Sequence, residues 1–393
     1  MRVRTLDDLE LDGKRALVRA DFNVPLRDGR ISDDTRIRAT IPTIQALRKR
    51  GASVVLMSHL GRPKGEVRDE LRLRPVAAHL GTLLDMQVSY AHDVTGPAAR
   101  KMANDLQPGE VGLIDNLRFD PREEKNDPEL AKELAGLGDC YVSDAFGAAH
   151  RAHASTVGVA EFLPSAAGLL MEKEITALSW VLHEAPQPFV VILGGAKVSD
   201  KIGVIENLMN RAQRLVIGGG MANTFLKAAG KDVGASLVED DNVATARDLM
   251  ERAARDGVDL RIPVDGVVAT RFDASAEART ISVDAFNPDD MMLDIGPETV
   301  ADFASALEGA RTIVWNGPMG VFEFEQFANG TKAIARIVAE SDAYSLIGGG
   351  DSVAAVEQMG LAGQISHIST GGGASLEFLE GQELPGVSVL LEG

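Results

Sequence analysis

The chain has 393 residues, of which 58 are acidic and 40 are basic, so its formal net charge at pH 7 is −18. This charge argues against a general nucleic-acid-binding protein, whose contact surface would be basic, although a local basic pocket on an acidic protein can still bind a small anion. With 45% hydrophobic residues the chain has enough apolar material to fold, and its length predicts two domains.

Short apolar segments in the first half of the chain predict strands that alternate with helices. We expect strands at residues 15–20, 52–57, 111–114 and 139–143. Residues 35–50 are expected to form a helix, because Ile37, Ile41, Ile44 and Leu47 fall on one helical face. Such alternation is typical of a parallel sheet with helices on both faces.

The second half repeats this alternation, and each of its strands runs into glycines. The strands and glycine runs are 189–193 with Gly194-Gly195, 215–217 with Gly218-Gly219-Gly220, 344–347 with Gly348-Gly349-Gly350, and 365–370 with Gly371-Gly372-Gly373. Helical spacing follows at residues 198–209 and 352–359. One such run is an ordinary tight turn. Four runs at one sheet edge predict a polyphosphate site, because glycine admits close approach and helix-start N–H groups attract phosphate.

An amphipathic segment separates the two halves. Ile175, Leu178 and Val181 give it an apolar stripe, and Pro186 closes it. We expect a helix over residues 169–185 to join two doubly wound, Rossmann-like α/β domains with a cleft between them. Their expected ranges are 1–168 and 186–380, with residues 381–393 packing back on the first domain.

Several functional classes find no support in the motifs. No P-loop motif is present, and no Gly-x-Gly-x-x-Gly motif opens a strand-helix-strand unit near the start, which argues against a P-loop enzyme and a nicotinamide dehydrogenase. The first ten residues lack the apolar core of a signal peptide, and no apolar run reaches the roughly 18 residues of a membrane helix. The single cysteine, Cys140, excludes an internal disulfide framework and is interpreted as buried filler. We therefore expect a cytoplasmic protein with no nucleic-acid or membrane partner.

Three charged residues lie beside the glycine runs of the second half. Lys197 and Lys201 are four residues apart and are expected on one helix face at its N-terminus, where an anion would offset their charge. The alternative is a pair of solvated surface lysines. Asp351 follows Gly348-Gly349-Gly350 and is placed either to hold Mg²⁺ together with phosphates or to cap a helix.

Basic side chains of the first half gather where predicted strands end. They are Arg36, His59, Arg62, Arg118, His150, Arg151 and His153. Arginine recognises phosphate and carboxylate through paired hydrogen bonds, so their shared topological position predicts an anion pocket. A zinc site at the two later histidines lacks a suitably spaced third ligand. Asp21 and Asn23 end the first strand and are either turn formers or partners for a substrate hydroxyl.

These residues predict a phosphoryl-transfer enzyme with one anion site on each domain, and the motifs carry a specific resemblance. The chain resembles the phosphoglycerate kinases in segments that follow the family's order over nearly its whole length. They are Asp21-Phe-Asn-Val-Pro25, Ser58-His-Leu-Gly-Arg-Pro63, His150-Arg-Ala-His153, Gly194-Gly-Ala-Lys-Val-Ser-Asp-Lys-Ile202, Gly218-Gly-Gly-Met-Ala222, Val314-Trp-Asn-Gly-Pro-Met-Gly-Val-Phe-Glu323, Gly348-Gly-Gly-Asp351 and Ser369-Thr-Gly-Gly-Gly-Ala-Ser375. The resemblance implies a monomeric glycolytic kinase that transfers a phosphoryl group directly between 1,3-bisphosphoglycerate and ADP, giving 3-phosphoglycerate and ATP, with Mg²⁺ and after closure of the two domains.

The resemblance also implies roles for individual residues. Phosphoglycerate would be bound by Asp21, Asn23, Arg36, His59, Arg62, Arg118 and Arg151. The nucleotide would be bound by Lys197, Lys201, Asn316, Glu323, Gly349, Gly350, Asp351 and Ser352, with Asp351 serving the metal. The transferring group would be stabilised by Arg36, Lys197, Lys201, Gly350 and Gly373.

Three positions depart from the family pattern. Asp115 replaces a common Glu, Ser352 replaces a frequent Thr, and Met292 lies near a position that is often glycine. If only the backbone is used at Met292, nothing changes; if its side chain is used, nucleotide affinity shifts. The competing interpretations are a different nucleotide-dependent sugar or carboxylate kinase and a non-enzymatic phosphometabolite-binding protein.

Overall fold

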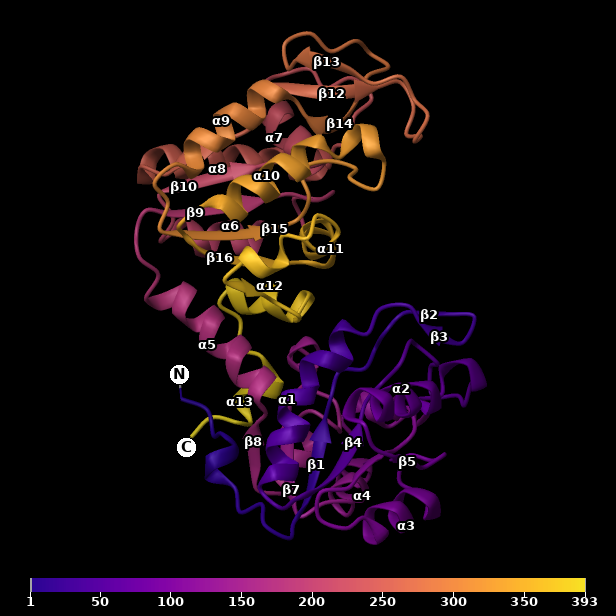
Figure 1. Cartoon of the computed structure of the whole chain (residues 1–393). Coiled ribbons are helices and arrows are strands. Elements are labelled where there is room, and N and C mark those ends of the chain that lie inside the picture. Colours follow the sequence, from indigo (N-terminus) through magenta and orange to yellow (C-terminus); the bar gives the residue numbers. More distant parts are fainter. Residues whose placement is uncertain (1, 393) are drawn as a thin grey trace. The chain divides into compact units, whose positions relative to one another are not determined.

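The computed structural model describes residues 2–392 and divides into two compact units. The first consists of Met1–Thr176 and Glu383–Gly393, and the second is Ala177–Gln382. Each is built on its own six-stranded parallel sheet with helices around it (Figure 1). Two parallel α/β units confirm the predicted fold class. The division falls inside helix α5 (Leu169–His183), which forms where the amphipathic stripe predicts a helix.

The sheet of the first unit has the strand order β5-β6-β4-β1-β7-β8. The strands are β1 (Arg15–Arg19), β4 (Ser53–Met57), β5 (Val88–Tyr90), β6 (Val111–Leu113), β7 (Cys140–Ser143) and β8 (Ser165–Ala167), and a small hairpin adds β2 (Leu26–Arg27) and β3 (Arg30–Ile31). All pairings in the six-stranded sheet are parallel. Loops that follow β1, β4, β6 and β7 therefore leave the same edge.

Alternate residues of each strand point to opposite faces of the sheet. Helices pack on the sheet and bury the apolar side chains there. The α-helices are α1 (Thr35–Lys49), α2 (Arg74–Leu84), α3 (Pro97–Asp105) and α4 (Pro128–Ala135), and short 3-10 turns include η3 (Leu117–Phe119), η4 (Glu123–Lys125) and η5 (Phe146–Ala148). One core joins α1 and α2 to one face of the sheet, with Ile37, Val76, Val54 and Val18 fully buried in it. Cys140 belongs to this core, which confirms its interpretation as a buried residue.

The sheet of the second unit has the order β11-β10-β9-β15-β16-β17. The strands are β9 (Phe189–Leu193), β10 (Arg214–Ile217), β11 (Asp259–Arg261), β15 (Thr312–Asn316), β16 (Tyr344–Gly348) and β17 (His367–Ile368), and an antiparallel sheet adds β12 (Asp265–Ala269), β13 (Arg279–Ser282) and β14 (Met291–Ile295). Strand β17 is shorter than the predicted segment 365–370. The glycine runs follow β9, β10, β16 and β17 at the carboxyl edge, as predicted from the sequence.

The helices of the second unit follow the strand ends. They are α6 (Ile202–Met209), α7 (Met221–Ala228), α8 (Val243–Asp256), α9 (Pro297–Leu307), α10 (Asn329–Glu340), α11 (Gly350–Gln358) and α12 (Gly373–Leu379). Helix α6 begins at Ile202, four residues later than expected. Residues 194–201 instead form a loop, which changes the interpretation of the two lysines discussed below.

The end of the chain returns to the first unit. Helix α13 (Pro385–Ser388) is followed by an antiparallel bridge between Val3 and Leu391, and the Gly386 N–H donates to the Ala149 carbonyl at 2.8 Å. Over the part of the chain that is described, no helix is long and apolar enough to span a membrane.

Candidate active site

The first unit gathers an ion pair at the carboxyl edge of its sheet. Asp21 follows β1 and is 7% exposed, and its Oδ2 lies 2.9 Å from Nη1 of Arg36, the second residue of α1. Its Oδ1 accepts the Asn23 N–H at 3.2 Å. The carboxylate thereby orients the guanidinium, whose side chain remains 39% exposed and available to an anion.

Asn23 and Arg118 anchor the loop that follows β4. Asn23 Oδ1 accepts the Gly61 N–H at 2.9 Å, and Arg118 Nη1 donates to the Gly61 carbonyl at 2.8 Å. Arg118 also lies 3.3 Å from Glu124 through Nε. Burial lowers the pKa of Arg118, yet an arginine stays charged at any ordinary pH. Both side chains thus shape the loop as well as offering polar groups.

His59 is also buried, at 7% exposure. Its Nδ1 lies 2.9 Å from Nη2 of Arg19. Burial, followed by repulsion from nearby arginines, lowers the pKa of His59 well below its ordinary value, so the imidazole is neutral. A neutral ring contributes hydrogen bonds and no charge.

The remaining basic residues differ in exposure. Arg62 and Arg151 are exposed, whereas His153 is buried and its pKa is lowered to about 4 by burial and the arginines around it. Within residues 2–392 no group of three His, Cys, Asp or Glu side chains is arranged to hold a metal. The geometry therefore favours an anion pocket over zinc at His150 and His153.

In the second unit, a cavity of about 530 Å³ opens beside the glycine loops. Its size is typical of a small-molecule pocket. It is lined by Gly195, Ala196, Gly219, Gly220, Ala235, Leu237, Phe272, Met291, Met292, Leu293, Pro318, Gly320, Val321, Glu323 and Asp351. Apolar side chains form one part of the wall, and glycine backbone with Glu323 and Asp351 forms another, which suits an aromatic base joined to polar groups.

Glycine is required where these loops approach each other. A Cβ at Gly219 would lie 2.5 Å from the Gly195 nitrogen, and the Gly219 φ is +66°. Gly349 precedes α11 with a φ of +89°. Both residues use backbone conformations that other amino acids rarely adopt.

The two lysines are placed differently from the prediction. The expectation that they share a helix face was wrong, because Lys197 is an exposed loop residue and Lys201 is the N-cap of α6. Lys201 is 8% exposed and donates to Oδ1 of Asn316, the last residue of β15. The Asn316 Nδ2 is buried with no protein partner among the described residues. This orphaned donor lies beside the Gly349 loop.

Burial lowers the pKa of Lys201 to about 8. Below that pH the ammonium is charged, and above it the charge is lost. We expect the Kd for ATP to increase on the order of tenfold between pH 7 and pH 9.5, because phosphate binding favours the charged form. Isothermal titration over this range measures the change. Lys201→Arg keeps its charge and is expected to remove the pH dependence, and a wild-type curve as flat as that of the variant would contradict the assignment.

The Ser352 hydroxyl makes a hydrogen bond inside the protein. Its side chain is fully buried, and its Oγ accepts the Gly317 N–H at 2.7 Å. The hydroxyl therefore holds the loop after β15, and only the backbone of Ser352 remains to meet a ligand. A threonine at this position would keep the same acceptor.

Removal of that hydroxyl is expected to destabilise the fold. Ser352→Ala leaves the Gly317 N–H buried without an acceptor, which costs on the order of 1–3 kcal/mol. Urea denaturation should show a lower midpoint with an unchanged slope. Ser352→Thr is the matched control and is expected to stay near wild type, so equal loss in both variants would point to packing and not to the hydrogen bond.

Asp351 lies in the first turn of α11, whose N-cap is Gly349, so the helix-cap alternative is wrong. Its carboxylate is exposed and makes no hydrogen bond or ion pair in the described chain. Mg²⁺ is usually held by one or two carboxylates together with phosphates and water. A single free carboxylate beside a glycine loop fits a metal that arrives with a nucleotide.

Met292 lines the cavity with 6% exposure. Its N–H donates to Ser236 Oγ at 2.9 Å, and a Cβ at Gly266 would lie 2.4 Å from its sulfur. The side chain is thus packed into the wall and narrows the apolar part of the pocket. Asp115 is structural, since its buried carboxylate accepts from the Leu73 N–H and from Arg72.

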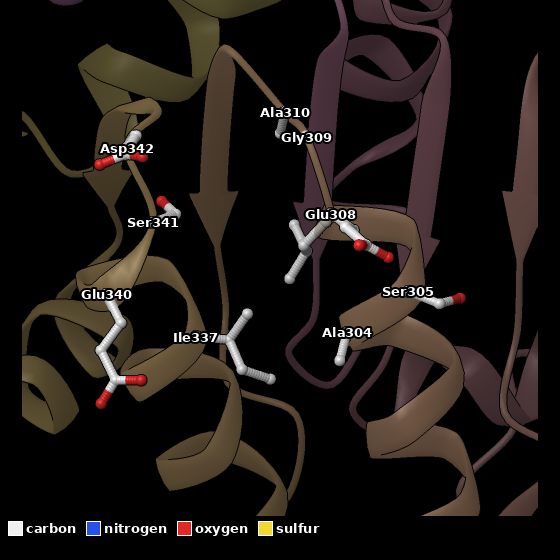
Figure 2. A pocket seen from close by; sticks show the side chains of 10 residues that line it. Ala304, Ser305, Glu308, Gly309, Ala310, Ile337, Glu340, Ser341 and Asp342 are labelled. Atoms are coloured by element: carbon white, nitrogen blue, oxygen red, sulfur yellow. The ribbon is translucent and has the colours of Figure 1, made fainter.

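A second cavity of the same unit has an acidic lining. It opens next to the amino ends of β15 and β16, away from the glycine loops, and Figure 2 shows carboxylates of Glu308, Glu340 and Asp342 around it. With no basic side chain in its lining, it is unsuited to phosphate. The anion-binding features of the second unit lie at the carboxyl edge.

Sequence reasoning missed the residues that support the sites. Arg19, Ser155 and Glu123 form a buried polar network behind His59, and Phe272 lines the cavity of the second unit. A signal for the first was present, because Arg19 is a charged residue that directly follows three apolar residues in strand β1. No local pattern marks Ser155 or Phe272, which reach their places through long-range folding.

Comparison with known proteins decides the family. The family model for phosphoglycerate kinase matches residues 6–382. The chain belongs to the phosphoglycerate kinase family. It is 58% identical to the phosphoglycerate kinase of Thermomicrobium roseum, over 99% of this chain and 100% of that protein, and 61% identical to that of Moorella thermoacetica, over 99% of each. The solved phosphoglycerate kinase of Coxiella burnetii superposes with a TM-score of 0.90 at 44% identity, covering 99% of both chains.

Membership in the phosphoglycerate kinase family gives the reaction. The enzyme is a glycolytic phosphotransferase that interconverts 1,3-bisphosphoglycerate and ADP with 3-phosphoglycerate and ATP. ATP and ADP are therefore its co-substrates. The alternatives of another carboxylate or sugar kinase and of a non-enzymatic binding protein are set aside by matches that run through nearly the whole chain.

Proposed function

We propose that this phosphoglycerate kinase holds its two substrates at the carboxyl edges of its two sheets. Phosphoglycerate is assigned to the first unit, at Asp21, Asn23, Arg36, His59, Arg62, Arg118 and Arg151. The nucleotide is assigned to the second unit, at Lys197, Lys201, Asn316, Glu323, Gly349, Gly350, Asp351 and Ser352. The observation that carries the proposal is the contrast between the two sites, one a cluster of basic side chains and the other a glycine-lined cavity with an apolar wall.

The residues of the first unit orient the three-carbon acid. Arg36, held by Asp21 at 2.9 Å, offers a fixed cation to the developing charge. Arg62 and Arg151 are exposed and are assigned to the non-reacting phosphate or the carboxylate. Asn23 and Arg118 fix the loop after β4 through their hydrogen bonds to Gly61.

The residues of the second unit orient the polyphosphate. Lys197 is an exposed loop cation, and Lys201 supplies a second charge held against Asn316. Gly350 and Gly373 are the first residues of α11 and α12, so their N–H groups belong to the unsatisfied helix starts that attract phosphate. Bound Mg²⁺, with Asp351 as its protein ligand, would neutralise phosphate charge.

Phosphoryl transfer needs no protein nucleophile, because positioning and charge stabilisation supply most of the catalysis. Direct in-line transfer requires the two substrates to meet. We assign this step to closure of the two domains, which also excludes water. The enzyme is proposed to act as a cytoplasmic monomer. The proposed functional domains are residues 1–168 with 381–393, and residues 186–380, joined by residues 169–185.

The test is a coupled assay with 3-phosphoglycerate, ATP and Mg²⁺, in which formation of 1,3-bisphosphoglycerate is followed. We expect turnover that falls to background when chelator is added or when 3-phosphoglycerate is replaced by glycerate. Turnover that persists with chelator would contradict the Mg²⁺ assignment, and equal activity with glycerate would contradict the proposed phosphate-binding pocket.

A further inference from the structure

We propose that Arg19 is a positioning residue that fixes the tautomer of His59, so that the imidazole offers Nε2–H to the substrate. The inference deepens the proposed phosphoglycerate site and rests on the role given there to His59. It concerns which ring nitrogen carries hydrogen, a property of the free enzyme that can be measured without any turnover.

The tautomer follows from the hydrogen-bonding chemistry of arginine. Arg19 Nη2 lies 2.9 Å from His59 Nδ1. A guanidinium only donates hydrogen bonds, so Nδ1 must accept with its lone pair. The hydrogen of the neutral ring therefore sits on Nε2. A ring protonated at both nitrogens would point Nδ1–H at a cation and lose this bond.

A buried network prevents Arg19 from turning away. The side chain is 1% exposed, and its other donors reach Ser155 Oγ at 2.9 Å and the Ala20 carbonyl. Ser155 donates from Oγ to Glu123 Oε1 at 2.5 Å, and its N–H donates to Oε2 at 3.0 Å. Glu123 has no exposed surface, so a buried carboxylate offsets the buried guanidinium through one serine.

The charges that face His59 keep it neutral. Arg19 on β1, Arg36 on α1 and Arg118 on η3 all oppose protonation, and His153 adds to them. Oε1 of Glu123, on η4, lies 3.9 Å from Nδ1 of His153. The same oxygen accepts a hydrogen bond from Ser155 Oγ. Among residues 2–392, no carboxylate hydrogen-bonds to His59 to stabilise a charged ring.

The tautomer decides whether His59 donates a hydrogen bond to the substrate or accepts one from it. Nε2 of His59 has no hydrogen-bond partner among the described residues and is not sealed from solvent. With hydrogen on that nitrogen, the ring donates to a carboxylate or phosphate oxygen and cannot accept from a hydroxyl. The opposite tautomer would present a lone pair to an anion and repel it.

The test uses the full-length enzyme labelled with ¹⁵N-histidine, and reads the protonation of each His59 nitrogen by NMR from pH 5.5 to 8.5. We expect a neutral ring with hydrogen on Nε2 throughout. Hydrogen on Nδ1, or titration of the ring near pH 6.5, would overturn the proposal whether or not the enzyme turns over phosphoglycerate. Loss of turnover with the expected tautomer would contradict only the substrate role assigned to His59.

Variants separate positioning from folding. Arg19→Met/Glu123→Gln removes the donor together with the buried carboxylate charge, and is expected to give mixed tautomers and a His59 pKa nearer its ordinary value. The KM for 3-phosphoglycerate should increase on the order of tenfold, the value of one lost hydrogen bond, while the KM for ATP is unchanged. Arg15→Met, on the same strand and paired with exposed Asp139, is the matched control and should leave the tautomer intact.

Two outcomes of the variant series would contradict the role. An unchanged Nε2–H tautomer in a folded double variant would show that Arg19 does not fix it. Ser155→Ala provides a milder second test, because it keeps the guanidinium and removes only one of its acceptors. It is expected to give a smaller shift in the same direction, and a shift larger than that of the double variant would show that the tautomer depends on packing.

Discussion

Arg36→Ala is expected to lower kcat by on the order of 10²-fold or more while the Kd for ATP stays near that of the wild type. Arg36 is assigned to the charge on the transferring group, and loss of one such preorganised donor has a cost of this size. ATP is assigned to the other unit, so its binding does not require this side chain. Steady-state kinetics and isothermal titration measure the two quantities.

Arg38→Ala is the matched control for this prediction. Arg38 lies on the same helix, is 60% exposed on its side chain and pairs with Asp34. Its removal is expected to leave kcat near wild type, because an exposed ion pair contributes little. Near-normal turnover in Arg36→Ala, or a loss in Arg38→Ala of similar size, would refute the assignment of Arg36.

Lys197→Met is expected to reduce kcat by a comparable factor, on the order of 10²-fold. Lys197 is exposed in the loop between β9 and α6, and it makes no hydrogen bond or ion pair in the described chain. The variant should therefore keep the wild-type thermal stability. A loss of activity with no loss of stability would place the effect in the chemistry and not in the fold.

Lys231→Met supplies the comparison for Lys197. Lys231 follows Gly230 and pairs with exposed Asp284, and it lies outside the loop between β9 and α6 that carries Lys197. The kcat of the Lys231→Met variant is expected to match that of the wild type. If Lys197→Met retains wild-type kcat at saturating ATP and 3-phosphoglycerate, the lysine does not stabilise the transferring group.

The elements of the fold were predictable where local signals agreed. Strands β1, β4, β9 and β16 are apolar segments that end in turn residues, and helix α5 follows an apolar stripe of the correct period. The start of α6 was not predictable, because the residues from Lys197 to Lys201 have helical spacing but are held in a loop. Two contacts with other parts of the unit hold it, since Gly195 N–H donates to Pro318 and Ser199 bonds to Glu239.

The candidate site was predictable to the extent that topology orders it. Parallel strands bring their carboxyl ends to one edge, so strand order alone predicts that Asp21, His59 and Arg118 lie together. The internal use of the Ser352 hydroxyl was not predictable, since its partner Gly317 is 35 residues earlier. The cavity wall was equally hidden, because Leu237 and Phe272 arrive there from separate segments.

The amino-acid sequence was enough to predict the α/β class, one glycine-rich and one basic group of candidate anion-binding residues, and the resemblance to phosphoglycerate kinases, because motifs and strand-to-loop order are local properties of the chain. Only the tertiary structure decided how individual side chains are used. It buried Arg19 against His59, placed Lys201 against Asn316 and left Lys197 exposed. Protonation and donor direction depend on burial and on neighbours far away in sequence, and those exist only once the chain has folded.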